Sequence, residues 1–136
     1  ARDNKPMTTK QYKLFLDDKL IGTTEFEKAD APMGTVFGQI NLINITSGYD
    51  YFKNHCLENN IELTADYTED KLIATQTIKN LKVLNANGIE IKGLGNQISG
   101  MDSDNFEITL VGVSYPLFEE EFPNHVKAYN EHFTDK

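Results

Sequence analysis

Three histidines and one cysteine are the side chains of this chain with the chemistry of a nucleophile or a transition-metal ligand. Cys56 directly follows His55, and neighbouring residues of a helix point about 100° apart, so His55 cannot activate the thiol through a hydrogen bond. His125 and His132 belong to a different predicted helix and do not have the spacing of a metal site. We therefore predict no enzymatic activity, no metal site and no cofactor.

Two further motifs resemble ligand loops but depart from them. Asp102-Ser103-Asp104-Asn105 alternates carboxylates as a calcium loop does, yet that loop needs Gly at its sixth position and Glu at its twelfth, where this chain has Glu107 and Val113. The glycines of residues 93–100 do not have the dinucleotide-binding spacing, and no helix pattern follows them. We predict a strand-connecting turn for the first motif and a flexible, irregular turn for the second.

The pattern most typical of a binding surface lies between Tyr115 and Tyr129, where aromatic residues alternate with carboxylates in a segment that Pro116 and Pro123 interrupt. Interfaces favour aromatic anchors, and an acidic rim steers a basic partner toward them. The predicted partner-binding residues are Asp102, Asp104, Tyr115, Phe118, Glu119, Glu120, Glu121 and Tyr129. The alternative is that Phe118 and Phe122 fill the core beneath the last helix, with the three glutamates solvated outside.

The charge of the chain supports an acidic binding surface. The formal net charge is -8, and residues 101–136 carry eight acids against two bases, whereas residues 1–100 carry 13 acids against 11 bases. Such a surface repels phosphate backbones and anionic lipids, so we predict neither nucleic acid nor membrane as a partner. Self-repulsion also predicts a monomer when the protein is alone.

Length and composition predict one domain over residues 1–136, because about two-thirds of the surface of such a chain can be buried without disulfides or metals. Residues 1–6 have the character of a processing remnant ahead of a natural start at Met7. The single cysteine, the lack of a signal pattern and the lack of a long apolar run predict a cytoplasmic protein.

Hydrophobic periodicity indicates which elements position these residues. Residues 81–84 and 89–92 flank a turn that ends in Asn87-Gly88, which predicts a hairpin. Further strands are predicted over residues 11–16, 20–27, 35–45 and 106–113, whereas residues 28–34 and 61–71 are predicted loops.

Two stretches of helical periodicity complete the pattern. Ser47 is the predicted N-cap of a helix whose apolar stripe is Tyr49, Phe52 and Cys56, and a last helix near Pro123 has the stripe Val126, Tyr129 and Phe133. The order of elements predicts an α+β fold, a mainly antiparallel sheet of about six to eight strands with two helices packed on it.

Several short motifs resemble those of a group of small acidic bacterial proteins: residues 22–25 and 29–34, Ile98-Ser99-Gly100-Met101-Asp102, and the run from Tyr115 to Pro123. In size and acidity these proteins resemble the immunity proteins of bacterial toxin systems, including contact-dependent inhibition. The resemblance implies stoichiometric inhibition, in which the acidic surface occupies the basic cleft of a cognate toxin protein. No functional residue of this chain can be assigned from the resemblance, because immunity proteins share no diagnostic motif.

Two other classes of function remain open at this point. One is a small-ligand-binding or enzymatic domain that uses the loop from Gly93 to Gly100 as the lip of a pocket, which a deep pocket beside that loop would favour. The other is a structural or oligomeric subunit, which an extensive apolar two-fold surface would favour.

Overall fold

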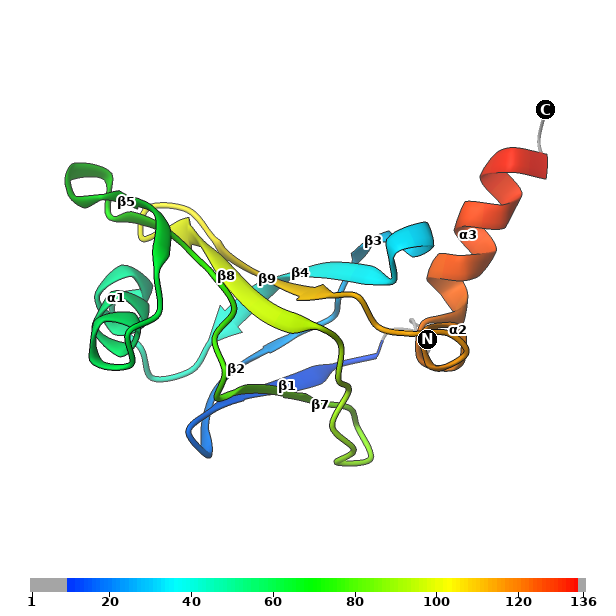
Figure 1. The fold of residues 1–136 in the computed structure, drawn as a ribbon, viewed down its shortest axis with the longest axis horizontal. Helices are drawn as coiled ribbons and strands as arrows, with labels where there is room; N and C mark the ends of the chain where they lie inside the picture. The colour runs from blue at the N-terminus through cyan, green and yellow to red at the C-terminus, as the bar shows by residue number, and fades with distance from the viewer. Residues whose placement is uncertain (1–9, 135–136) are drawn as a thin grey trace, which may run out of the picture.

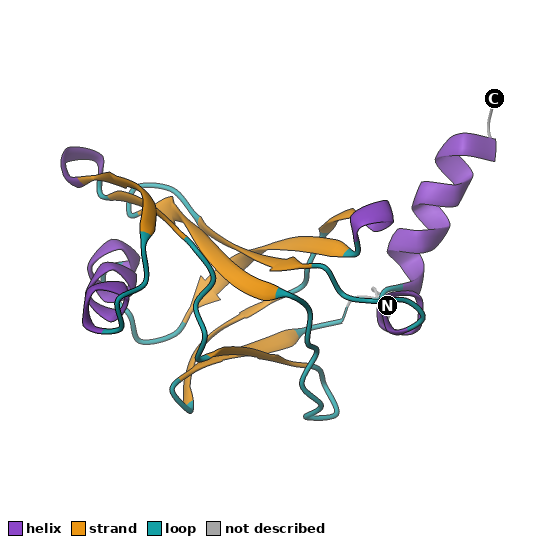
Figure 2. Ribbon diagram, in the orientation of Figure 1, coloured by secondary structure: helices purple, strands orange, loops and turns teal. Residues whose placement is uncertain are grey.

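The structure, a computed structural model, describes residues 10–134 and the side chains of residues 10–131. In this range nine strands form one antiparallel sheet, accompanied by three α-helices and two 3-10 helices (Figures 1 and 2). The strands are β1 (Tyr12–Leu16), β2 (Lys19–Thr24), β3 (Lys28–Asp30), β4 (Thr35–Leu42), β5 (Leu63–Tyr67), β6 (Leu72–Thr75), β7 (Leu81–Leu84), β8 (Gly95–Met101) and β9 (Phe106–Val111). The helices are η2 (Ala31–Met33), α1 (Gly48–Glu58), η3 (Thr68–Asp70), α2 (Leu117–Glu121) and α3 (Pro123–Thr134).

The predicted α+β class and antiparallel sheet are confirmed. The strand order is β5-β6-β8-β9-β4-β2-β1-β7, with β3 also paired to β4, so there is one strand more than the predicted range allows. Helix α1 lies at one end of the sheet, while α2 and α3 lie at the opposite end, where α3 points away from the sheet (Figure 1). None of the helices among residues 10–134 is long and apolar enough to cross a membrane.

Helix α1 forms where its sequence predicts it. The Ser47 hydroxyl accepts a hydrogen bond from the Asp50 N–H at 3.1 Å, and the helix ends at Glu58. Phe52 and Cys56 of its apolar stripe are fully buried, and the Phe52 ring lies 5.8 Å from the Phe106 ring of β9. The helix therefore closes the core at its end of the sheet.

Strand β4 pairs with β3 near its start and with β2 near its end. Between β2 and β3 the chain leaves the sheet over residues 25–27, which we call the β2–β3 bulge. Phe26, at a φ of +48°, turns its ring into the core and is 1% exposed. Gly38 of β4 allows the bulge to pass close by, because a Cβ there would lie 2.8 Å from the Phe26 backbone nitrogen. The Gln39 N–H beside the bulge donates to Glu27 Oε2 at 2.9 Å.

The prediction of an irregular turn over residues 93–100 is wrong. Residues 95–101 are β8, which pairs with β6 on one edge and with β9 on the other. Its side chains are mostly half-buried and only Ile98 is fully buried, so the strand lacks an apolar pattern. Gly100 serves close packing, since a Cβ there would lie 2.3 Å from the Asn105 carbonyl oxygen.

Two predicted loops also contain strands. Residues 63–67 form β5, an edge strand whose side chains are half-buried or exposed, so burial imposes no apolar alternation on it. Residues 28–34 hold the three-residue β3 and helix η2, which ends at Gly34 with a φ of +64°. The predicted loops thus contribute short elements to the edges of the sheet.

The predicted hairpin over residues 81–92 is confirmed in its first arm and its turn. Strand β7 forms, and the Gly88 N–H donates to the Asn85 carbonyl oxygen at 2.9 Å. The second arm makes a single bridge, from Leu84 to Glu90, and is not a regular strand. Strand β7 pairs with β1 and is the last strand in the order of the sheet, so none of the described strands lies beyond the second arm.

Candidate functional site

The predicted partner-binding residues do not form one surface. Asp102 and Asp104 lie in the turn from β8 to β9, beside α1, whereas Tyr115 and Glu119 lie with α2 and α3 at the other end of the sheet (Figure 1). The sheet separates the two acidic groups because β9 runs from one end of the molecule to the other. One partner patch therefore cannot be built from the whole predicted set.

Asp102 has a structural role at the beginning of α1. Its carboxylate accepts hydrogen bonds from the Ser47 hydroxyl and, at 2.9 Å, from the Tyr49 N–H. Ser47 is the N-cap, and the Tyr49 N–H belongs to the first turn of the helix, whose N–H groups have no partner within the helix. Asp104, by contrast, is exposed and accepts a hydrogen bond only from the neighbouring Asn105 side chain among the described contacts, at 3.2 Å.

Phe118 lies in the core, which confirms the alternative interpretation of this residue. Its ring is 0% exposed and stands 5.3 Å from the rings of both Tyr115 and Phe122. Phe118 therefore cannot contact a partner without a rearrangement of α2.

Glu121 points inward, contrary to the prediction of three solvated glutamates. It follows Phe118 by three residues, so both side chains lie on the same face of α2. The Glu121 carboxylate accepts a hydrogen bond from the Tyr12 phenol at 2.8 Å and one from the Asn85 amide at 3.3 Å. Glu119 and Glu120 remain exposed on the outer faces of the helix.

Of the predicted residues at this end of the sheet, Tyr115, Glu119, Glu120 and Tyr129 are exposed. We call Tyr115, Glu119 and Tyr129, together with the exposed Met33 of η2, the Tyr115 surface. The phenol of Tyr115 donates to the Ala31 carbonyl oxygen of η2 at 2.8 Å, and α3 packs against η2. The exposed fractions of Met33, Tyr115 and Tyr129 are 66%, 48% and 39%. Partial burial raises the pKa of Tyr115, and the charges of Glu119 and Tyr129 raise it further.

The last helix has the predicted beginning at Pro123. Val126 is half-buried against the core, and Tyr129 belongs to the Tyr115 surface. The side chain of Phe133, the third residue of the predicted stripe, lies outside the described residues.

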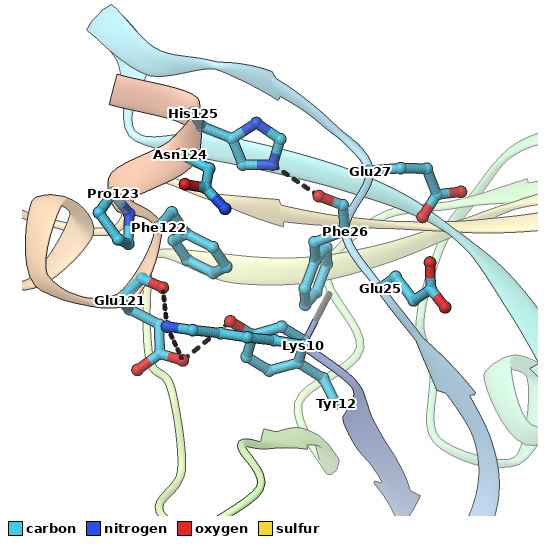
Figure 3. Close-up of a pocket in the computed structure, with 10 residues that line it drawn as sticks. All are labelled: Lys10, Tyr12, Glu25, Phe26, Glu27, Glu121, Phe122, Pro123, Asn124 and His125. Atoms are coloured by element: carbon cyan, nitrogen blue, oxygen red, sulfur yellow. Dashed lines mark hydrogen bonds and ion pairs between the residues drawn. The ribbon is translucent and has the colours of Figure 1, made fainter. Parts of the chain in front are cut away.

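Sequence reasoning missed a pocket of about 210 Å³, which we call the Tyr12 pocket (Figure 3). Three segments meet there: the beginning of β1, the β2–β3 bulge and the junction of α2 with α3. The lining residues are Lys10, Tyr12, Glu25, Phe26, Glu27, Glu121, Phe122, Pro123, Asn124 and His125. In the sequence, Phe26 stands between Glu25 and Glu27. This alternation of apolar and acidic residues is also typical of an ordinary strand, so it did not indicate a pocket.

The interior wall of the Tyr12 pocket is aromatic. The rings of Tyr12, Phe26 and Phe122 pack against one another with centroid distances of 5.1 to 5.9 Å. Burial, and then the hydrogen bond to Glu121 and its charge, raise the pKa of Tyr12, so the phenol stays protonated and acts as a donor. His125 Nε2 lies 2.6 Å from the Phe26 carbonyl oxygen, which can only accept, so this nitrogen carries the proton.

The mouth of the Tyr12 pocket carries charges. Lys10 Nζ donates to the Glu121 carbonyl oxygen at 2.7 Å and lies 3.9 Å from Glu121 Oε2. Glu25 and Glu27, on either side of Phe26 in the chain, are exposed, and Figure 3 shows their carboxylates directed away from the aromatic rings. The pocket thus combines an aromatic wall with the paired charges of Lys10 and Glu121.

The surroundings of Cys56 and His55, the other candidates for catalysis, indicate structural roles. Cys56 is 0% exposed, and burial raises the pKa of its thiol, which disfavours the nucleophilic thiolate. His55 Nδ1 lies 3.6 Å from Asp17 Oδ2. Among the residues that the structure describes, no three His, Cys, Asp or Glu side chains are close enough to hold a metal ion.

The alternative function required residues 93–100 to form a loop at the edge of a pocket. Most of that segment is strand β8 instead, so this loop does not form. Comparisons of the chain with protein-family models, with curated proteins and with solved structures found no match.

Proposed function

We propose that the chain is an immunity-type protein, which binds a cognate, basic bacterial toxin domain and neutralises it by occupying its functional cleft. The observation that carries the proposal is the Tyr115 surface, where two partly exposed tyrosines lie beside Glu119 in the most acidic quarter of the sequence. Aromatic side chains with a polar tip are enriched among the residues that dominate binding energy. Carboxylates at their edge favour a basic partner over an acidic one.

Inhibition of this kind needs no catalysis, cofactor or nucleic acid. The formal charge of -8 speeds encounter with a basic toxin and keeps copies of the chain apart, so the protein acts as a monomer until it meets its partner. An inhibitor that protects the cell that makes it acts in the cytoplasm, where a single buried thiol stays reduced.

The test is a charge reversal on α2. Glu119→Lys together with Glu120→Lys changes the formal charge of this edge from -2 to +2, at two exposed positions. The matched control is Glu69→Lys with Asp70→Lys, an equally exposed acidic pair in η3 at the other end of the sheet. The partner is sought in the reading frames beside the gene for this chain, as the carboxyl-terminal domain of a large secreted protein.

We expect the α2 variant to bind that domain at least about tenfold more weakly, because like charges then face each other in the complex. The loss should be largest at low salt, where exposed charges are least screened. Growth of cells that produce the toxin domain should be rescued by the wild-type chain and by the η3 control, but less by the α2 variant. Absence of both binding and rescue with the wild-type chain would refute the proposal.

A further inference from the structure

The sulfur-containing side chains of the described residues differ in their accessibility. Cys56 is 0% exposed, and burial raises the pKa of its thiol, so little of the thiolate that reacts with a peroxide is present. Met101 is half-buried, and its sulfur accepts a hydrogen bond from the Ser103 hydroxyl at 3.2 Å. Met33 is 66% exposed. Among residues 10–131, Met33 therefore offers an oxidant the most accessible sulfur-containing side chain.

Hydrogen bonds hold the backbone on which Met33 lies. Helix η2 ends at Met33, and the N–H of the next residue, Gly34, donates to the Ala31 carbonyl oxygen at 3.0 Å. The same carbonyl oxygen accepts the Tyr115 phenol at 2.8 Å, and the Gly34 carbonyl oxygen accepts the Val113 N–H at 2.7 Å. The exposed side chain of Met33 therefore extends from a fixed piece of backbone that Tyr115 also contacts.

An oxygen atom added to the sulfur of Met33 would change the surface rather than the core. The hydrogen bonds that hold η2 join backbone groups and the Tyr115 phenol, and the Met33 side chain takes no part in them. A thioether is apolar and polarizable, and it packs well against apolar and aromatic groups of a partner. The sulfoxide is polar, so its burial in an interface without a hydrogen-bond donor is unfavourable.

We propose that Met33 is a site of reversible oxidation by hydrogen peroxide, and that its sulfoxide weakens binding by the Tyr115 surface; the effect on binding rests on the proposed function. The sulfur lone pair attacks one peroxide oxygen, so that an S–O bond forms and the O–O bond breaks. The sulfur loses two electrons, and the departing hydroxide takes the proton of the transferred oxygen and leaves as water. Methionine sulfoxide reductases reverse the change, oxidising two thiols to a disulfide and releasing water.

The first experiment needs no partner. The chain carries Met7→Leu, because Met7 lies outside the described residues, and it is treated with hydrogen peroxide at neutral pH while peptide mapping by mass spectrometry follows Met33 and Met101. We expect Met33 to oxidise at least about fivefold faster than Met101 in the folded chain, and at a similar rate in urea. The two methionine sulfoxide reductases together should restore the thioether. Equal rates in the folded chain would overturn the site.

The second experiment measures binding. The same chain is titrated into the toxin domain before oxidation, after oxidation and removal of the peroxide, and after reductase treatment. We expect the sulfoxide to bind at least about fivefold more weakly at an unchanged melting temperature, and the reductases to restore the affinity. Met33→Leu keeps an apolar side chain of similar size without sulfur, so its affinity should be the same before and after peroxide. An equal loss in Met33→Leu would assign the effect to another group and overturn the regulation.

The outcomes separate this inference from the proposed function. If the chain and its Met33 sulfoxide bind the toxin domain equally well, the regulation is overturned and the immunity function stands. If Met33 is oxidised selectively but the unmodified chain binds no toxin, the immunity function and the regulation fail, and the modification site remains. Selective oxidation of Met33 together with weaker, reductase-restored binding is the result expected.

Discussion

The Tyr12 phenol donates a hydrogen bond of 2.8 Å to the Glu121 carboxylate, across 109 positions of the sequence. This contact connects the first strand to α2, and it forms one wall of the Tyr12 pocket. The Glu121 side chain is 13% exposed, so its removal leaves a phenol donor without a partner in a buried setting.

Glu121 should matter for stability far more than its neighbour. We expect Glu121→Ala to lower the free energy of unfolding by about 2 kcal/mol, because a charge-assisted hydrogen bond is lost and the Tyr12 phenol stays buried. Glu120→Ala, at an exposed position of the same helix, should change it by less than about 0.5 kcal/mol. Urea unfolding measures both, and equal effects would contradict the inward orientation of Glu121.

The stability of the wild-type protein should fall more steeply with rising alkaline pH than that of a Tyr12→Phe variant. Burial raises the pKa of Tyr12 in the folded state, whereas the unfolded phenol ionises near its usual value of 10.0. The stabilising term is therefore complete below pH 10 and is lost as the pH rises above it, by up to about 1.4 kcal/mol per pH unit. Unfolding curves at several pH values between 9 and 11 check this, and parallel curves for both proteins would contradict it.

Phe118 and Tyr115 should respond differently to truncation. Phe118→Ala removes a fully buried ring and should lower the free energy of unfolding by about 3–5 kcal/mol. Tyr115→Ala removes a half-exposed ring and the hydrogen bond to Ala31, which should cost about 1–2 kcal/mol. Affinity for the toxin domain, measured with folded protein, should fall in the Tyr115 variant, and an unchanged affinity would remove Tyr115 from the interface.

Asp102 should stabilise α1 and contribute nothing to partner binding. We expect Asp102→Ala to lower the free energy of unfolding by about 1–2 kcal/mol, since the Ser47 hydroxyl and the Tyr49 N–H lose their acceptor. Asp104→Ala, in the same turn, is the control and should change stability by less than about 0.5 kcal/mol. A larger loss of toxin affinity than of stability in the Asp102 variant would return this residue to the interface.

The thiol of Cys56 should be inert in the native protein. It is fully buried and its pKa is raised by burial, so a thiol reagent at neutral pH should label it only after unfolding. Cys56→Ser should lower stability by about 1–3 kcal/mol, because it puts a hydroxyl among apolar side chains, and should preserve toxin binding. Rapid labelling of the folded protein is the outcome that contradicts a structural role.

Local sequence patterns were sufficient to predict the fold class and several of the helices and strands. The N-cap at Ser47 and the stripe of Phe52 and Cys56 predict α1 correctly, because a helix satisfies its own backbone and needs one apolar face. The strong alternation of residues 106–111 likewise predicts β9, which is buried on one face at every second residue. The acidity of the last quarter of the chain is a property of composition and requires no structure.

Tertiary structure decided what local patterns could not express. Strand β8 is held by hydrogen bonds on both edges, to β9 after a short turn and to β6, which lies 25 to 29 positions earlier, so its polar residues and glycines carry no sign of a strand. The orientation of Glu121 depends on a phenol that is 109 residues away, and the sequence treats it as identical to Glu119 and Glu120. The Tyr12 pocket exists because the β2–β3 bulge turns Phe26 inward against β1 and the beginning of α3. Side-chain types and short-range spacing determine most of the helices and strands, whereas contacts between distant segments determine which of their residues face the core and which face solvent.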